Sequence, residues 1–236
     1  MTTNPRSLKE VFAHTLYINL DSRPDRLEHV RQELAKVGIG ETNAQRISAT
    51  KTPNGALGCT LSHIRSLEEA MAADVPCVFI CEDDITFTNP PLFLHNLAAF
   101  LEIGVTWDVI IVGGNLCPPY GAVTLNNGVS NTTANFCCRV FNCQTTTGYI
   151  VARHYYSTLL ANFRKSAEAL ARGMSGREAA IDISWKSLQP TGDWYMIMPA
   201  TVTQYENYSD IERRVVQYDA LMLDTEKKWL HRPMMN

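Results

Sequence analysis

The stretch Val75-Pro76-Cys77-Val78-Phe79-Ile80-Cys81 is followed directly by Glu82-Asp83-Asp84. A short apolar run of this kind predicts a buried strand, and it ends in a cluster of carboxylates at the rim of the core. Carboxylates this close resist ionising together, and a divalent cation relieves the repulsion. Ligand sets made only of oxygen suit Mg²⁺ or Mn²⁺. Because alternate residues of a strand share a face, Glu82 and Asp84 would face a ligand together. A solvated acidic turn is the alternative for this motif taken alone.

Strands and helices alternate along the rest of the chain. The expected strands are 16–20, 75–81, 107–112, 146–152 and 194–202, and the expected helices are one ending at Gly38, then 57–73, 92–101, 154–172 and a short one from 181. This order predicts an α/β fold with a mainly parallel central sheet and helices on both faces. Residues 116–144 carry no periodic pattern and indicate a long loop. No linker divides the chain, so a single domain over residues 1–236 is expected.

The turn after the first expected strand, Asn19 to Arg26, brings two guanidinium groups to the start of a helix. Asp21 or Ser22 is expected to cap this helix. The positive end of the helix, together with Arg23 and Arg26, suits an anionic ligand such as a diphosphate. Two surface arginines on a capped helix are the alternative.

The composition excludes several classes of protein. A formal net charge of -3 and the absence of a basic run give no basis for nucleic-acid binding. No apolar stretch is long enough to cross a membrane, and no signal peptide is visible, so a cytoplasmic location, with a peripheral membrane position left open, is expected. The seven cysteines form no pair of Cys-x-x-Cys motifs, which indicates reduced thiols.

Three segments together resemble the signature blocks of glycosyltransferase family 25. They are Tyr17-Ile18-Asn19-Leu20-Asp21-Ser22-Arg23-Pro24-Asp25-Arg26, Gly58-Cys59-Thr60-Leu61-Ser62-His63 and Ile80-Cys81-Glu82-Asp83-Asp84. That family includes bacterial lipooligosaccharide β-galactosyltransferases and collagen galactosyltransferases. Its later blocks are similar to Thr147–Val151, to Asp182–Trp185, and to Gln204 with Ser209-Asp210-Ile211. The order and approximate spacing also agree. Residues 116–144 do not align with the family, and acceptor choice is expected to lie there.

The resemblance implies a GT-A-like, Rossmann-type fold and a metal-dependent UDP-sugar glycosyltransferase. Such an enzyme transfers a hexose, with galactose expected, from a UDP-sugar donor to a hydroxyl of a glycan or glycoconjugate acceptor, as in lipopolysaccharide biosynthesis. The implied cofactor is Mn²⁺ (or Mg²⁺). The implied site residues are Asp84 and Glu82 for the metal, Asp83 for the ribose or a second metal position, Asn19, Arg23 and Arg26 for the nucleotide, and Ser62 and His63 for the donor pocket.

The expected reaction builds negative charge on the departing diphosphate, which a cation and arginines stabilise. An inverting enzyme also needs a carboxylate that deprotonates the acceptor hydroxyl. Asp182 is the candidate base, since it is the acid of a later family-like block. Asp108, Asp193 and Asp210 are the alternatives.

Two other classes of protein remain open from the sequence. A sugar nucleotidyltransferase also uses a nucleotide and a metal, but it is expected to carry a glycine-rich phosphate loop after its first strand. Asn19-Leu20-Asp21-Ser22-Arg23 contains no glycine. A non-catalytic carbohydrate-binding protein on the same fold is the second alternative.

Overall fold

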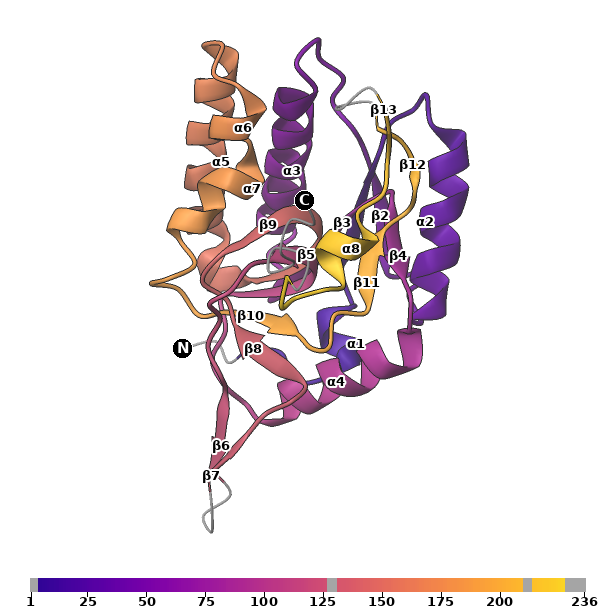
Figure 1. Cartoon of the computed structure of the whole chain (residues 1–236). Coiled ribbons are helices and arrows are strands. Elements are labelled where there is room, and N and C mark those ends of the chain that lie inside the picture. The colour runs from indigo at the N-terminus through magenta and orange to yellow at the C-terminus, as the bar shows by residue number, and fades with distance from the viewer. Residues whose placement is uncertain (1–3, 127–130, 210–213, 228–236) are drawn as a thin grey trace, which may run out of the picture.

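The computed structural model describes residues 4–126, 131–209 and 214–227, and its centre is a seven-stranded sheet (Figure 1). The strand order is β2-β1-β3-β9-β5-β10-β8. The strands are β1 Thr15–Asn19, β2 Ala44–Ser48, β3 Cys77–Glu82, β5 Val109–Leu116, β8 Cys137–Arg139, β9 Cys143–Ala152 and β10 Trp194–Ile197. Five strands run in one direction, while β8 and β9 run in the other. The predicted α/β fold with a mainly parallel sheet is therefore confirmed.

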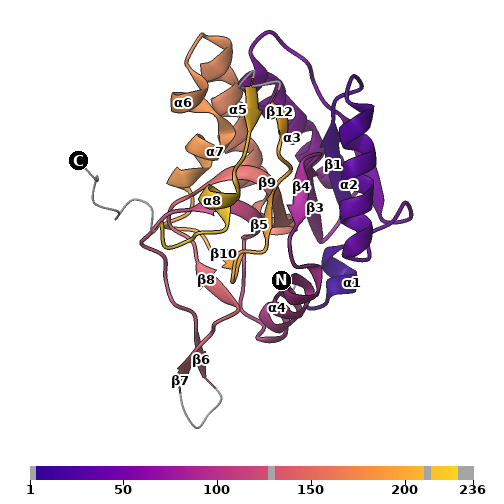
Figure 2. The same ribbon diagram turned by 45° about the vertical axis from the view of Figure 1, so that its right-hand side comes forward.

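Helices cover both faces of the sheet, as predicted (Figures 1 and 2). Helices α3 Gly55–Ala72 and α5 Tyr156–Ala171 pack together on one face. Helices α1 Leu8–Val11, α2 Pro24–Lys36 and α4 Pro90–Glu102 lie on the other. The shorter elements are β4 Ile85–Phe87, η1 Arg153–Tyr155, α6 Gly176–Ala179, α7 Ile181–Ser184, η2 Trp185–Ser187, β11 Val202–Gln204, β12 Asn207–Ser209, β13 Arg214–Val216 and α8 Asp219–Met222. None of the helices within the described ranges has the length and apolarity that crossing a bilayer requires.

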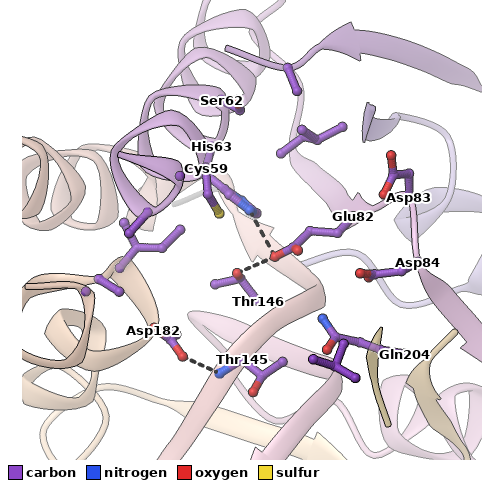
Figure 3. A pocket seen from close by; sticks show the side chains of 18 of the residues that line it. Cys59, Ser62, His63, Glu82, Asp83, Asp84, Thr145, Thr146, Asp182 and Gln204 are labelled. Carbon is purple, nitrogen blue, oxygen red and sulfur yellow. Dashed lines mark hydrogen bonds and ion pairs between the residues drawn. The ribbon is translucent and has the colours of Figure 1, made fainter. Parts of the chain in front are cut away.

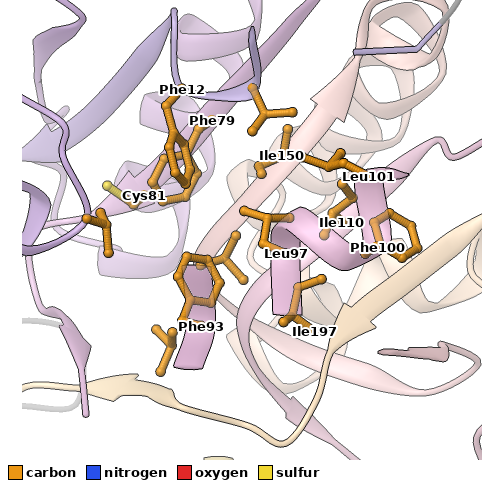
Figure 4. Packing of buried hydrophobic residues seen from close by; sticks show 14 of the residues in the cluster. Phe12, Phe79, Cys81, Phe93, Leu97, Phe100, Leu101, Ile110, Ile150 and Ile197 are labelled. Atoms are coloured by element: carbon orange, nitrogen blue, oxygen red, sulfur yellow. The ribbon is translucent and has the colours of Figure 1, made fainter. Parts of the chain in front are cut away.

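The apolar run of β3 is buried on both sides because its residues alternate between two core layers. Cys77, Phe79 and Cys81 pack in the layer that α4 covers. Val78 and Ile80 pack in the layer under α3 and α5. Figure 4 shows the first layer, where side chains of α4 meet those of the central strands. Two buried faces explain why this strand reads as a continuous apolar run rather than an alternating one.

Residues 116–144 are not the unstructured loop that the sequence predicts. Strands β6 Thr124–Asn126 and β7 Asn131–Thr133 form a ladder that projects from the body in both views. Strand β8 joins the edge of the main sheet beside β10. The chain then returns as β9 and pairs antiparallel with β5, with no crossover helix between them. A crossover helix is needed only between parallel strands. The short strands β6, β7 and β8 can therefore connect β5 to the antiparallel strand β9 without one.

The predicted cap of α2 is wrong. The residue at the cap position is Arg23, and it makes no side-chain cap hydrogen bond. The carboxylate of Asp21, by contrast, accepts hydrogen bonds from Arg46 Nη2 (2.5 Å) and Ser48 Oγ (2.9 Å). Asp21 therefore ties the turn to β2 and leaves the start of α2 without a side-chain cap.

The single strand predicted over residues 194–202 is two strands in different sheets. Strand β10 ends at Ile197, and β11 pairs with β4 outside the main sheet. Pro199 lies between them and has no amide hydrogen to donate to a ladder. The break brings β11, with Gln204 at its end, across from the strand that follows the acidic triplet.

Candidate functional site

A cavity of about 1420 Å³ lies at the edge of the sheet where β1, β3 and β5 end. Because β9 is antiparallel to its neighbours, its first residues reach the same edge. Turns and helix ends from α2, α3, α6, α7 and the C-terminal strands complete the wall. The residues expected from the sequence that border this cavity are Arg23, Arg26, Ser62, His63, Glu82, Asp83, Asp84 and Asp182. Asn19 lies behind the wall and does not line it.

The acidic triplet sits where β3 turns into β4. Figure 3 shows Glu82 and Asp84 reaching into the same space, with Asp83 turned aside. The Oδ1 atom of Asp84 is buried and has no hydrogen-bond partner among the residues that the structure describes. Burial, and next the charge of Glu82, raise the pKa of Asp84 to about 8. A buried acceptor without a donor, beside a second carboxylate, is the local chemistry of a cation site.

The guanidinium of Arg26 lies against the two aspartates. Its Nη1 atom is 3.0 Å from Asp83 Oδ1 and 3.2 Å from Asp84 Oδ2. Nη2 donates to the carbonyl oxygen of Tyr208 in β12 at 3.1 Å. Nε is buried without a partner. Arg26 therefore connects α2, the acidic turn and the C-terminal strands, and it retains one donor for a ligand.

Asn19 positions Asp83 rather than contacting the cavity. Its Nδ2 donates to Asp83 Oδ2 at 2.7 Å, and its Oδ1 accepts from Arg46 Nε at 3.0 Å. Asn19 is almost completely buried. With Arg26 on the other oxygen, both oxygens of Asp83 are engaged within the protein.

Helix α3 carries the second family-like block. Asn54 begins the helix, and its side chain accepts from the amide of Leu57. Ser62 is fully buried, where its Oγ accepts from the amide of Thr50 (2.8 Å) and donates to the carbonyl of Gly58 (2.7 Å). The hydroxyl of Ser62 therefore holds the loop after β2 against the helix, at the floor of the cavity.

His63 and Cys59 occupy one face of α3 and point toward Glu82 (Figure 3). His63 Nε2 is 3.4 Å from Glu82 Oε1, and Thr146 Oγ1 donates to the same oxygen at 2.5 Å. Ligand atoms of Cys59, His63 and Glu82 all lie within 4.8 Å of one another. The sequence reasoning did not include Cys59 or Thr146 in the site. The four-residue spacing of Cys59 and His63 was the signal that could have found the first of them.

Asp182, the candidate base, lies on α7 at the wall of the cavity. Its Oδ2 accepts a hydrogen bond from the amide of Thr145 at 3.1 Å (Figure 3). Thr145 has a φ of 77°, in the left-handed region that is unfavourable for a β-branched residue. Burial raises the pKa of Asp182, opposed by the Thr145 hydrogen bond and reinforced by Glu82. A carboxylate with a raised pKa is better suited to accept a proton than a solvated one.

Two of the other candidate bases, Asp108 and Asp193, do not reach the cavity. Asp108 Oδ2 accepts from the amide of Asp193, and Asp108 Oδ1 is 2.8 Å from His154 Nε2. Asp193 pairs with Arg139 Nη1 at 2.8 Å. Neither aspartate lines the cavity, because both precede strands and so lie at the opposite edge of the sheet. Asp210 lies outside the described residues.

The cavity wall combines acids with bases. Its acidic side chains are Glu82, Asp83, Asp84 and Asp182, and its basic ones are Arg23, Arg26, Lys51, Arg177 and Arg214. Acids gathered at one strand end, with cations around them, can hold a divalent cation and an anionic ligand side by side.

Comparisons with solved structures gave remote likenesses. A mannose-1-phosphate geranyltransferase from Thermus thermophilus is 12% identical over 78% of this chain and 73% of its own, with a TM-score of 0.43. A197 from STIV is 14% identical over 86% of this chain and 94% of its own, with a TM-score of 0.40. A glycosyltransferase involved in glycosylation of the major capsid of PBCV-1 is 8% identical over 78% of this chain and 80% of its own, with a TM-score of 0.42. A search of curated proteins gave no significant match.

A family model also matches part of the chain. The matched segment, residues 41–104, contains two of the three signature-like blocks, those of α3 and of the acidic triplet. The arginine turn and Asp182 lie outside it. The matching model is that of glycosyltransferase family 25 (LPS biosynthesis protein), and over this segment it confirms the predicted resemblance to that family.

Proposed function

We propose that this chain is a metal-dependent glycosyltransferase that transfers a hexose, with galactose expected, from a UDP-sugar to a hydroxyl of a glycan or glycoconjugate, with inversion. The family match over residues 41–104 supports glycosyl transfer. One observation carries the proposal furthest. The arginine turn, the α3 block, the acidic triplet and Asp182 are far apart in sequence, yet all border one cavity.

The metal in this proposal is Mn²⁺ (or Mg²⁺), held chiefly by Asp84 with Glu82. The fit rests on the buried Oδ1 of Asp84, which lacks a partner, and on a donor set of carboxylate oxygens. The pKa of Asp84 is raised first by burial and then by the charge of Glu82. A bound cation would relieve the repulsion between the two carboxylates. When bound, such a cation supplies electrostatic stabilisation of the departing diphosphate.

The basic side chains supply the rest of the donor site. Arg23 and Arg26 would donate hydrogen bonds to phosphate oxygens, and the free Nε of Arg26 is available for this. Asn19 and Asp83 keep Arg26 in place through the contacts described above. Ser62 and His63 would form the floor beneath the donor sugar.

Asp182 would act as the base toward the acceptor hydroxyl. It borders the cavity, and the amide of Thr145 fixes one of its oxygens. The other oxygen would accept the proton as the hydroxyl attacks the anomeric carbon. Burial, which raises the pKa of Asp182, favours this transfer.

The first test is UDP release from a panel of UDP-sugars, with and without Mn²⁺. We expect Mn²⁺-dependent release with one hexose donor, and a loss of at least about a hundredfold in Asp84→Asn, since a catalytic cation contributes several kcal/mol. Asp74→Asn is the matched control, because Asp74 is exposed and remote from the cavity. Wild-type activity in Asp84→Asn would exclude Asp84 as the metal ligand.

Pyrophosphate release from UTP and a sugar phosphate would indicate a nucleotidyltransferase instead. Sugar binding without either reaction would indicate a non-catalytic protein.

The second test separates donor binding from transfer. Asp182→Asn should bind the UDP-sugar with wild-type affinity, while its turnover falls about 10²–10⁴-fold. Calorimetry with the UDP-sugar measures the first quantity, and a transfer assay measures the second. Transfer at the wild-type rate would remove Asp182 from the mechanism.

A further inference from the structure

A second ligand set lies beside the acidic triplet and contains sulfur and nitrogen. Cys59 and His63 stand four residues apart on α3, so they share a face of the helix. That face meets Glu82 at the end of β3, as Figure 3 shows. Their ligand atoms lie within 4.8 Å of one another. The set combines a thiol, an imidazole and a carboxylate.

The imidazole of His63 has a nitrogen without a hydrogen bond. His63 is fully buried, and its Nδ1 lies 2.8 Å from the hydroxyl of Tyr149. Among the described residues Nε2 makes no well-aligned hydrogen bond, and Glu82 Oε1 lies 3.4 Å away, at ion-pair distance. Leaving a buried polar atom unpaired costs about 1–3 kcal/mol. Such a cost, in a cavity wall, points to a ligand that the atom would bind.

The surroundings of the set resemble the supporting contacts of a metal site. The hydroxyl of Tyr149 can accept a hydrogen bond from a protonated Nδ1. That tautomer leaves a lone pair on Nε2, the state in which histidine binds a metal. Thr146 Oγ1 orients Glu82 through its 2.5 Å hydrogen bond to Oε1. His63 and Glu82 therefore each have a second partner that fixes the orientation of the side chain.

The spacing also fits. Bond lengths of about 2.0–2.2 Å to nitrogen and oxygen at tetrahedral angles place the two ligand atoms roughly 3.3–3.5 Å apart. The observed separation of His63 Nε2 and Glu82 Oε1 is 3.4 Å.

We propose that Cys59, His63 and Glu82 form a binding site for a thiophilic divalent cation of the Zn²⁺ type, with a fourth position open to the cavity. A donor set of sulfur, nitrogen and oxygen selects Zn²⁺ over Mg²⁺ or Mn²⁺, which prefer oxygen alone. The proposal goes beyond sugar transfer, although Glu82 and His63 also border the donor site proposed above. It adds a metal that differs in chemistry from the one proposed at Asp84.

Binding must displace the thiol proton. The carboxylates of Glu82, Asp84 and Asp182 line the same cavity as the Cys59 thiol. The same carboxylates attract a cation, and a bound cation stabilises the thiolate. Each ion bound should therefore release a proton, and affinity should rise with pH.

The test is a cobalt titration of the full chain after removal of metals with a chelator, in the absence of any donor. We expect a charge-transfer absorption band that saturates at one thiolate-bound Co²⁺ per chain, and loss of that band when Zn²⁺ is added. Cys59→Ser should abolish the band and weaken Zn²⁺ binding by at least about tenfold. Cys117→Ser is the matched control, since Cys117 is only partly buried and belongs to no cluster found among the described residues. It should keep the band.

Tyr149→Phe provides a second variant that preserves shape. It removes the contact to Nδ1 and should weaken Zn²⁺ binding about 10–100-fold while the band remains. A wild-type protein without the band, or a Cys59→Ser protein that keeps it, would overturn the proposal. Because the titration is carried out without a donor and reads the cobalt–thiolate band, these outcomes do not depend on the sugar-transfer assay.

Discussion

Buried polar atoms without hydrogen-bond partners gather around the cavity. Among the described residues they are Arg26 Nε, His63 Nε2, Asp84 Oδ1, Asn115 Oδ1 and Thr147 Oγ1. All but Thr147 belong to side chains that line the cavity, and Thr147 directly follows Thr146 on β9. Native proteins leave few such atoms unpaired, because each costs free energy. These atoms lie at one site and include both donors and acceptors. Such a grouping is typical of a surface that binds a polar ligand.

Asp84 should make stability depend on pH. Its pKa is raised to about 8, mainly by burial and then by Glu82. An acid whose folded-state pKa is raised stabilises the fold at low pH, and this contribution is lost as the pH rises from about 4 to about 8. Asp84→Asn cannot ionise, so in metal-free protein it should raise the free energy of unfolding at pH 8 by about 1–3 kcal/mol relative to wild type.

Urea denaturation with chelator at pH 5 and pH 8 measures this effect. The gain should be clearly smaller at pH 5, where wild-type Asp84 is largely protonated. Equal gains at both pH values would show that ionisation of Asp84 is not the cause.

At the scale of elements, helix α3 approaches the chain after β2 very closely. A Cβ atom at Gly58 would collide with the backbone carbonyl oxygen of Thr50. Ser62, one turn further along, bonds the amide of that same Thr50. Gly58 and Ser62 of the second signature-like block therefore both support the contact between α3 and Thr50. This contact fixes the start of α3 beside the cavity.

Gly58→Ala should accordingly destabilise the protein by about 1–3 kcal/mol, although alanine favours helices more than glycine does. Gly40→Ala is the control, since nothing lies within 4 Å of a Cβ there. It should change the free energy of unfolding by no more than about 0.5 kcal/mol. Denaturant titration measures both variants, and an unchanged Gly58→Ala would mean that the loop yields without cost.

At the scale of the whole molecule, Arg26 joins three regions that are distant in sequence. It contacts Asp83 and Asp84 between β3 and β4, and Tyr208 of β12 near the end of the chain. Arg23 reaches the same carbonyl of Tyr208 at 3.2 Å. The C-terminal strands are thus held over the cavity by the turn that begins α2.

Arg26→Met should remove this link and leave the carboxyl groups of Asp83 and Asp84 without the guanidinium that lies against them. Losing one partner of a buried ion pair costs about 3–5 kcal/mol, and we expect a loss of that size at pH 7. Arg65→Met is the matched control, because Arg65 is exposed and its ion pair in the described part of the chain is a 4.0 Å contact with the exposed Glu69. That variant should lose less than about 0.5 kcal/mol. Similar losses in both variants, measured by denaturant titration, would contradict the role of Arg26.

The sequence by itself determined the α/β class, the buried strand ending in Glu82, and the main helices. These follow from local periodicity, which the chain carries within each segment. A likeness in several ordered blocks also pointed to eight of the side chains that border the cavity, but not to Cys59 or Thr146, and Asn19 lies behind the wall. The family match over residues 41–104 confirms two of those blocks.

Only the tertiary structure decided which side chains contact one another in the cavity. The reversal of β9, which no local pattern encodes, brings Thr145 and Thr146 to the carboxyl ends of its neighbours. That reversal gives Asp182 and Glu82 their hydrogen bonds. Cys59 gained its place beside Glu82 in the same way, through packing of α3 on β3. Local spacing fixes which face a residue occupies, but contacts between distant segments depend on how the elements pack.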